Sequence, residues 1–223
     1  MKREVLVNGG TGYIGGRLVA ALIARGHHVR VLARAASIDR VRAGAEAIIG
    51  SALEANSIES ALSGTDTLVH LIGTAHPNPS KANEFVSVDL ASAKAAVCAA
   101  KRKSLAHFVY VSVAQPAPVM KAYVAARAEA EKAIRDSRIA ATIVRPWYVV
   151  GPGHWWPIVL VPFHALARLI PATRETAGRL GLVTVKQMVV ALVYAIENPP
   201  FPGEMRIVDV PAIKRSTIAP NLA

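Results

Sequence analysis

Cysteine and acidic residues are scarce in this sequence of 223 residues. The single cysteine, Cys98, excludes an internal disulfide framework and a cysteine-based zinc site, and its alanine-rich surroundings favour a place in the core. Only 15 acidic residues stand against 26 lysines and arginines, which gives a formal net charge of +11. Such a charge suits a polyanionic ligand, but because no basic block dominates the sequence, we expect no nucleic-acid partner.

Three further features are missing from the sequence. The first predicted strand follows directly on residues 1–4, which leaves no room for a cleavable signal sequence, so we expect a cytoplasmic location. The apolar stretch 155–163 is too short and too interrupted by proline to cross a bilayer, but peripheral contact with the inner face of a membrane stays open. His70, His76 and His107 do not fall at metal-ligand spacing, so we predict no metal site.

Apolar runs of strand length alternate with longer helical segments along most of the sequence. The strands are rich in valine and isoleucine and barely alternate with polar residues, which predicts a parallel sheet buried on both faces. This pattern is typical of an α/β protein with a doubly wound parallel sheet. Strands are predicted at residues 5–8, 29–33, 47–49, 67–71, 107–112, 141–144 and 205–208, and helices at residues 14–25, 57–63, 83–103, 123–137 and 185–197.

A glycine-rich turn joins the first predicted strand to the first predicted helix. Gly9 allows the tight turn, Gly12 lets the backbone approach a pyrophosphate, and Gly15 lets the helix pack closely on the strand. The amides at the helix N-terminus would then hold the phosphate. A purely structural turn is the alternative, but the place at the first βα junction favours a bound dinucleotide. The contacts expected from this segment are Gly9, Thr11, Gly12, Tyr13, Ile14 and Gly15.

Arg34 ends the second predicted strand, where a domain that selects NAD would carry an acidic residue for the ribose 2′-hydroxyl. An arginine can bind the 2′-phosphate of NADP with two parallel hydrogen bonds, so NADP(H) is favoured over NAD(H). Arg40 and Arg42 cluster just beyond it. The alternative for Arg34 is an ordinary exposed arginine.

The alternation of strand and helix stops after Pro146, where a loop rich in glycine and proline begins. We therefore expect three parts: a dinucleotide-binding domain over residues 1–150, a small apolar appendage over 151–180, and a C-terminal helix and strand over 181–223 that return to the main body.

The glycine spacing and three later segments resemble the short-chain dehydrogenase/reductase superfamily. The segments are 109–112 (Val-Tyr-Val-Ser), 123–127 (Tyr-Val-Ala-Ala-Arg) and Arg145-Pro146 ahead of Gly-Pro-Gly at 151–153. The sequence is most similar to the extended and atypical branches, namely the NAD-dependent epimerase/dehydratase, NmrA-like and complex I accessory-subunit types. The resemblance covers most of the chain and implies a Rossmann fold with the cofactor across the carboxyl ends of the strands.

The same resemblance implies Tyr123, Ser112 and Arg127 as catalytic residues. Arg127 stands where the family has a lysine, four residues after the tyrosine and on the same helix face, and it keeps the charge in a planar fork. The catalytic hydroxyl of the family falls two residues after Ser112, at Ala114, so the triad is incomplete. Tyr123 is therefore either a general acid or a cover of the nicotinamide pocket. The further cofactor contacts implied are Gly73, Thr74, Tyr123, Arg127 and Pro146.

Two classes of function stay open. One is an NADP(H)-dependent oxidoreductase for a small carbonyl or quinone-like substrate, because the appendage is shorter than the substrate domain of nucleotide-sugar epimerases. The other is a catalytically silent NAD(P)H-binding sensor or assembly factor, favoured by Arg127, Ala114 and the basic surface. Relatives suggest a homodimer formed through the helices at 83–103 and 123–137.

Overall fold

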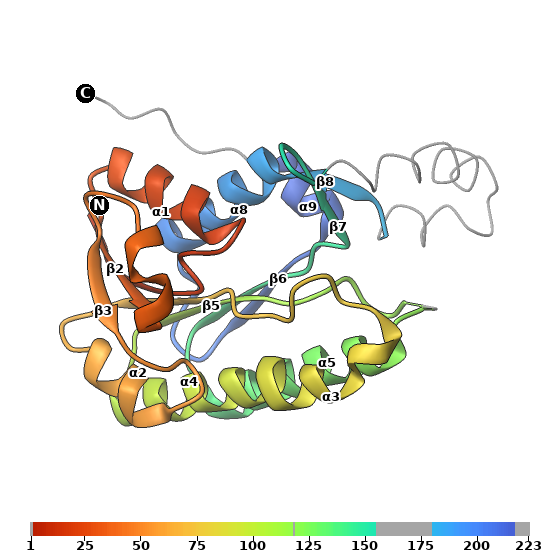
Figure 1. Ribbon diagram of the computed structural model, residues 1–223, viewed down its shortest axis with the longest axis horizontal. Coiled ribbons are helices and arrows are strands. Elements are labelled where there is room, and N and C mark those ends of the chain that lie inside the picture. Colours follow the sequence, from red (N-terminus) through yellow and green to blue (C-terminus); the bar gives the residue numbers. More distant parts are fainter. Residues whose placement is uncertain (1, 118, 155–179, 217–223) are drawn as a thin grey trace.

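The computed structural model describes residues 2–117, 119–154 and 180–216. Its centre is a seven-stranded parallel sheet in the order β3-β2-β1-β4-β5-β6-β9 (Figure 1). The direction of winding reverses between β1 and β4, which makes that junction the topological switch point. The strands are β1 (Glu4–Asn8), β2 (His28–Ala33), β3 (Glu46–Ile49), β4 (Thr67–His70), β5 (His107–Val111), β6 (Ala141–Val144) and β9 (Met205–Val208). The prediction of a doubly wound α/β fold is confirmed.

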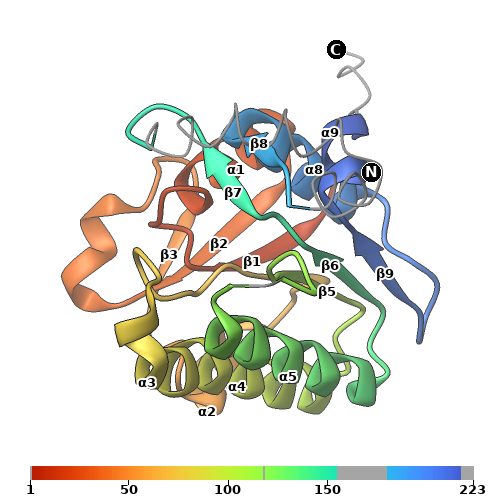
Figure 2. The same ribbon diagram turned by 90° about the vertical axis from the view of Figure 1, so that its right-hand side faces the viewer.

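Helices cover both faces of the sheet (Figures 1 and 2). Helices α1 (Gly15–Ala24) and α8 (Val185–Glu197) lie together on one face, and the other face carries α2 (Ala55–Ala61), α4 (Ala91–Arg102) and α5 (Lys121–Ser137). The remaining helical elements are α3 (Ala82–Glu84), α9 (Val210–Arg215) and the turns η1 (Ala35–Arg40), η2 (Pro79–Lys81) and η3 (Phe85–Leu90).

The core is divided by the sheet into two apolar layers. Along β1, Val5 and Val7 belong to the layer under α1 and α8, whereas Leu6 belongs to the layer that faces α4 and α5. This is the two-sided burial that the valine-rich strands predict. The edge strand β3 differs, because Ile49 at its end is 67% exposed. The prediction of burial on both faces is therefore wrong for β3, because this strand lies at the edge of the sheet and its residues are largely exposed.

The helix predicted over residues 83–103 is not continuous. The π-helical turn η3 interrupts it, and the regular helix α4 begins only at Ala91. Such turns bring an extra residue into the helix and are frequent at functional sites. Here η3 buries both Phe85 and Asp89, each 1% exposed.

Two short strands after Pro146 correct the prediction of a loop there. β7 (Tyr148–Val150) pairs in parallel with β8 (Leu182–Thr184) as a separate two-stranded sheet. A capping box between Thr184 and Gln187 then starts α8. Residues 155–179 lie outside the described residues, so the apolar appendage and its segment 155–163 stay predictions. None of the described helices is long and apolar enough to cross a membrane.

Candidate cofactor and active site

The glycine-rich turn lies between β1 and α1, at the switch point of the sheet. Gly9 adopts a left-handed φ of +87°, and its carbonyl accepts a hydrogen bond of 3.0 Å from the amide of Gly12. A Cβ on Gly15 would lie 2.1 Å from the Gly9 carbonyl oxygen, so the helix can start against the turn only with glycine there. The first turn of α1 has no acidic residue and no side-chain cap, so no side chain of this turn offsets the positive end of the helix dipole.

A polar cavity of about 450 Å³ opens beside this turn. Its walls are the start of α1 on one side and the segment after η1 on the other. Arg40 and Arg42 are exposed, and neither forms an ion pair within the described part of the chain. Arg34 is exposed at the start of η1 and does not line the cavity. The lining residues are Thr11, Gly12, Tyr13, Gly16, Arg17, Asp39, Arg40, Val41, Arg42 and Ala43.

The turn after β4 lies directly over the Arg127 guanidinium. A Cβ on Gly73 would lie 2.3 Å from Arg127 Nη2, so no side chain fits at position 73 without displacing the arginine. Thr74 follows, and both its amide and its hydroxyl donate to Asp89 Oδ1, at 2.6 and 3.3 Å. Gly73 and Thr74 are thus brought to the same place as Arg127, although they are far apart in the sequence.

Arg127 itself is held from several sides, with only 5% of its side chain exposed. Its Nη1 donates to the Tyr110 hydroxyl and to the Val111 carbonyl, both at 3.1 Å, and its Nη2 lies 3.7 Å from Asp89 Oδ2. Burial raises the pKa of Asp89, and the Arg127 charge lowers it in part. Burial alone would lower the pKa of Arg127, but the neighbouring Tyr123, Tyr110 and Asp89 raise it above its ordinary value, so the guanidinium stays charged.

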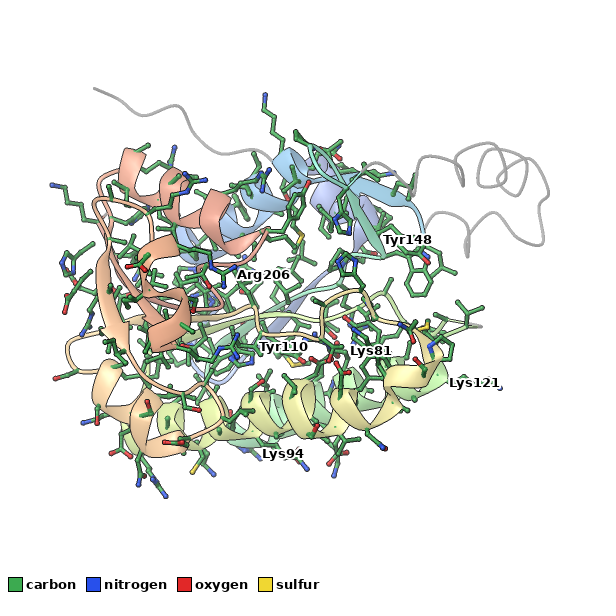
Figure 3. The ribbon with its side chains drawn as sticks, in the orientation of Figure 1. Lys81, Lys94, Tyr110, Lys121, Tyr148 and Arg206 are labelled. Atoms are coloured by element: carbon green, nitrogen blue, oxygen red, sulfur yellow. The ribbon has the colours of Figure 1, made fainter. Side chains whose placement is uncertain are left out.

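Tyr123 shares a helix face with Arg127, as their spacing predicts. The guanidinium carbon lies 5.2 Å from the centre of the Tyr123 ring, and the ring of Phe85 packs edge-on against it at 5.0 Å. Tyr123 is half-buried. Tyr110 is fully buried, and it lies between the sheet and the helices on the α4 and α5 side (Figure 3).

Ser112 follows the last residue of β5 and is 3% exposed. Its amide donates to the Val144 carbonyl at 2.8 Å, and its hydroxyl has no hydrogen-bond partner among the described residues. Ala114 is also buried, and its amide donates to the Pro146 carbonyl at 2.8 Å. These bonds hold the ends of β5 and β6 together, next to the segment that bears Pro146.

A second buried carboxylate, Glu131 on α5, fixes the residue before Pro146. Arg145 donates to it through Nε at 3.0 Å and through Nη2, and Gln115 donates to the same carboxylate at 2.8 Å. A cavity of about 470 Å³ opens beside this cluster. Its lining is Gln115, Pro116, Ala117, Lys121, Val124, Ala125 and Arg145. Lys121 and Tyr148 both lie at the end of the molecule where the strands finish (Figure 3).

Three rings connect the loops at this edge. The His154 ring lies 5.3 Å from that of Tyr13 and stacks on His76 at 5.6 Å.

His70, at the end of β4, is fully buried. Burial is the main cause that lowers its pKa to about 3, and the Arg127 charge adds to it, so His70 is neutral. Among the described residues, no three histidine, cysteine or acidic side chains form a metal-binding group.

Asp89, Tyr110 and Glu131 are site residues that the sequence did not reveal. Asp89 and Glu131 lie in predicted helices, where a charged residue is ordinarily exposed to solvent. The only signal for Asp89 is its position inside the apolar run Phe-Val-Ser-Val-Asp-Leu.

Comparison with known proteins places this geometry in a family. The sequence model of the NAD(P)H-binding family matches residues 9–151, well over half of the chain. Ceramide reductase of Caulobacter vibrioides is 26% identical over 197 residues, which cover 87% of this chain and 61% of the relative. The 4-hydroxy-2-methyl-3-oxo-4-farnesyl-3,4-dihydroquinoline-1-oxide ketoreductase of Stigmatella aurantiaca is 27% identical over 170 residues, 66% of this chain and 51% of the relative.

This chain therefore spans only about three fifths and one half of the lengths of these two relatives. Among solved structures, a short-chain dehydrogenase/reductase superfamily protein of Agrobacterium tumefaciens with bound NAD superposes with a TM-score of 0.66 at 16% identity. The superposition covers 94% of this chain and 80% of that protein, and it shows a shared fold.

Proposed function

This chain belongs to the NAD(P)H-binding family, with the fold of the extended short-chain dehydrogenases/reductases, and we propose that it is an NADP(H)-dependent reductase of a small apolar carbonyl or quinone-like substrate. The main observation behind the proposal is that three features lie together at the carboxyl edge of the sheet. They are the glycine-rich turn, the small-residue turn at Gly73, and Tyr123 beside the charged Arg127. The names of the relatives, a ceramide reductase and a ketoreductase, agree with carbonyl reduction.

The residues at the edge fit a dinucleotide. Gly9, Gly12 and Gly15 carry no side chains into the turn, and among the described residues the amides of Tyr13 and Ile14, just ahead of α1, have no acceptor, so they can bind a pyrophosphate. Elsewhere on the carboxyl edge of the sheet, Gly73 presents backbone without a side chain, and Pro146 follows the end of β6. In this proposal they lie along the nicotinamide half, and Thr11, Tyr13, Ile14 and Thr74 complete the contacts.

The preference for NADP(H) is supported by the charge of the polar cavity. Arg17, Arg40 and Arg42 line it against a single acid, Asp39. Arg42 Nε lies 3.8 Å from where a Cβ on Gly16 would be, so it faces the turn that would hold the pyrophosphate. We therefore assign the 2′-phosphate to this cavity, with Arg42 as its main donor and Arg34 as an outer one.

Paired titrations with NADPH and NADH test this assignment. Removing a charge-assisted contact costs about 1.5–3 kcal/mol, so Arg42→Ala should lower the preference for NADPH over NADH about tenfold or more. Arg34→Ala should lower it less. Arg135→Ala removes an exposed arginine on α5 and serves as the control. An unchanged preference in both Arg42→Ala and Arg34→Ala would refute the assignment.

When bound, the reduced nicotinamide would supply a hydride to the substrate carbonyl. The chain itself supplies the proton, from the Tyr123 hydroxyl to the carbonyl oxygen. The positively charged Arg127, whose guanidinium carbon lies 5.2 Å from the centre of the Tyr123 ring, holds this ring at the site of proton transfer. Ser112 is assigned to orient the substrate oxygen, because its hydroxyl is unpaired within the described residues.

The cavity beside Gln115 is our candidate for the substrate. It is an open depression of about 470 Å³, in which Pro116, Ala117, Val124 and Ala125 provide apolar surface and Gln115, Lys121 and Arg145 provide polar groups. The apolar part of this lining supports a small carbonyl substrate.

The reaction is tested with Tyr123→Phe and a panel of carbonyls and quinones. Loss of a general acid costs roughly 100-fold or more in turnover, while NADPH affinity should stay within about threefold of wild type. Tyr194→Phe changes an exposed tyrosine on α8 and should turn over like wild type. If Tyr123→Phe kept the wild-type rate, Tyr123 would not be the acid.

A silent NAD(P)H sensor or assembly factor is the second candidate, favoured by the buried Ala114 at the hydroxyl position of the family and by the enclosure of Arg127. Wild-type protein that binds NADPH but reduces nothing in the panel would select this second candidate.

Three further expectations from the sequence remain proposals. They are peripheral membrane contact through residues 155–163, a homodimer formed through α4 and α5, and the division of the chain into three parts at residues 150 and 180. Vesicle flotation and the mass of the protein in solution test the first two.

A further inference from the structure

Three aromatic rings from three separate loops lie in a row at the carboxyl edge of the sheet. Tyr13 belongs to the glycine-rich turn after β1, His76 to the loop after β4, and His154 to the turn after β7. The His154 ring contacts both of the others, at 5.3 Å from the ring of Tyr13 and 5.6 Å from that of His76. The two imidazole planes are only 13° apart, so these rings are stacked.

This row crosses the switch point of the sheet. β1 and β4 are neighbours there, and open α/β sheets bind their ligands outside the carboxyl ends of the strands at such a point. Tyr13 follows β1 and His76 follows β4, so His154 connects the two sides of the cofactor site. A dinucleotide must therefore pass this row when it enters or leaves.

Tyr13 is the fixed end of the row. Arg17 Nη1 donates to the Tyr13 carbonyl at 2.8 Å, and the guanidinium carbon lies 4.2 Å from the centre of the Tyr13 ring. The Tyr13 hydroxyl is buried, and a Cβ on Gly151 would come within 2.7 Å of it. Tyr13 is thereby held by α1 on one side and by the base of the turn that carries His154 on the other.

His76 is held in an uncommon backbone conformation. Its φ is +49°, in the left-handed region that residues other than glycine adopt mainly where surrounding contacts hold them there. Asn78 Nδ2 donates to the His76 carbonyl at 3.3 Å, and Lys81 Nζ donates to the preceding carbonyl, that of Ala75, at 2.6 Å. These bonds hold the backbone that presents the imidazole to His154.

His154 is the part of the row that can move on its own. Among the described residues it forms hydrogen bonds only with Gly151, at 2.7 and 3.3 Å, within its own turn. Pro152 and Gly153 between them are exposed. The tip of the turn can therefore move without breaking a hydrogen bond to another element, and the ring contacts with Tyr13 and His76 hold it in place.

We propose that Tyr13, His154 and His76 form a clasp across the cofactor site, which opens by movement of His154 and governs the exchange of the dinucleotide. A contact between two aromatic rings is worth a factor of about two to ten in an equilibrium constant, so two such contacts keep the clasp mostly closed while thermal motion still opens it. The inference depends on the binding of a dinucleotide and not on the reaction proposed above.

Stopped-flow fluorescence with NADPH measures this exchange in both directions. A gate slows entry and exit alike, whereas a side chain that only touches the bound ligand changes mainly the exit. His154→Ala removes both ring contacts, so association and dissociation should each become about tenfold faster, with a Kd within about threefold of wild type. His154→Phe keeps a ring and should exchange NADPH at rates close to those of wild type.

A second variant removes the other end of the row. Asparagine tolerates a left-handed φ, so His76→Asn loses the ring without straining the loop and should speed both rates by about two- to tenfold. His28→Ala changes an exposed histidine on β2 and is the matched control. It should exchange NADPH like wild type.

An association rate that is unchanged in both His154→Ala and His76→Asn would overturn the clasp. Faster dissociation alone would also overturn it, because that result would make the rings contacts of the bound ligand and not a gate. If His154→Ala does not fold, His76→Asn decides. Failure of the reductase assignment is seen separately, as NADPH binding without turnover, and if the protein prefers NADH, the same rates are measured with NADH.

Discussion

Replacing Gly15 with alanine should damage both folding and cofactor binding. The new Cβ would lie 2.1 Å from the Gly9 carbonyl oxygen and 2.8 Å from Gly10 Cα. All three of the nearest atoms belong to backbone, so α1 or the turn must shift by about 1.4 Å to bring the 2.1 Å approach to a normal contact distance of roughly 3.5 Å. Overpacking of this kind typically costs about 1–3 kcal/mol.

The neighbouring Gly16 provides a control within the same helical turn. A Cβ there would meet nothing closer than 3.7 Å, which is ordinary contact, and alanine gains about 0.5–1 kcal/mol over glycine inside a helix. Gly15→Ala should therefore be about 3 kcal/mol less stable than Gly16→Ala when both unfold in urea. Because the Gly9 carbonyl also anchors the Gly12 amide, a shifted turn should weaken NADPH binding at least tenfold. Equal stability of the two variants, together with wild-type NADPH affinity in Gly15→Ala, would refute the role given to Gly15.

Three other predictions concern the groups that support the site. Arg145→Met leaves the buried Glu131 carboxylate without its ion pair, so the free energy of unfolding in urea should fall by about 3 kcal/mol; an unchanged value would mean that the pair is not needed. Burial, first among the causes, lowers the pKa of His107 to about 4, so below about pH 6.5 the unfolded chain binds a proton that the native chain does not. Stability should therefore fall as the pH drops from 7 to 4, by up to about 3 kcal/mol from this group, and a slope in His107→Gln as steep as in wild type would contradict the assignment. Thr184→Ala removes the capping box of α8 and should cost about 1 kcal/mol in thermal or urea unfolding, whereas a loss below the error of the measurement would show that the cap is dispensable.

The sequence predicts the sheet well because burial on both faces leaves a direct mark on composition. The seven strands of the main sheet lie within one residue of the predicted bounds, and the predicted helix at 185–197 coincides with α8. Continuous valine and isoleucine runs occur where a parallel strand is covered twice. The glycine-rich turn can also be predicted from the sequence, because each of its glycines is required by close contacts with neighbouring atoms in the chain.

What the sequence does not predict depends on contacts between distant segments. The break at η3 arises where Asp89 turns inward to Thr74, 15 residues earlier in the chain, and no periodicity marks it. β7 and β8 are three residues long and are separated by about 30 residues, so each exists only because it pairs with the other. β7 was also obscured by the glycine and proline residues that follow it.

Some features of the candidate site could likewise be predicted from the sequence, and others could not. Gly9, Gly15 and the pairing of Tyr123 with Arg127 follow from local spacing. The burial of Arg127 beneath Gly73 could not be predicted from local spacing, because it requires contact between the turn after β4 and helix α5. The sequence also did not predict that Arg42, rather than Arg34, lines the polar cavity, because both are exposed arginines near the second strand.

A crystal structure of the protein with NADP⁺ tests the central claim most directly. The account predicts the pyrophosphate over the amides that follow Gly12, the 2′-phosphate in the cavity of Arg42, and the nicotinamide C4 facing Tyr123 with room for a carbonyl oxygen between them. A dinucleotide bound elsewhere, or a nicotinamide turned away from Tyr123 with its C4 inaccessible to that hydroxyl, would contradict it.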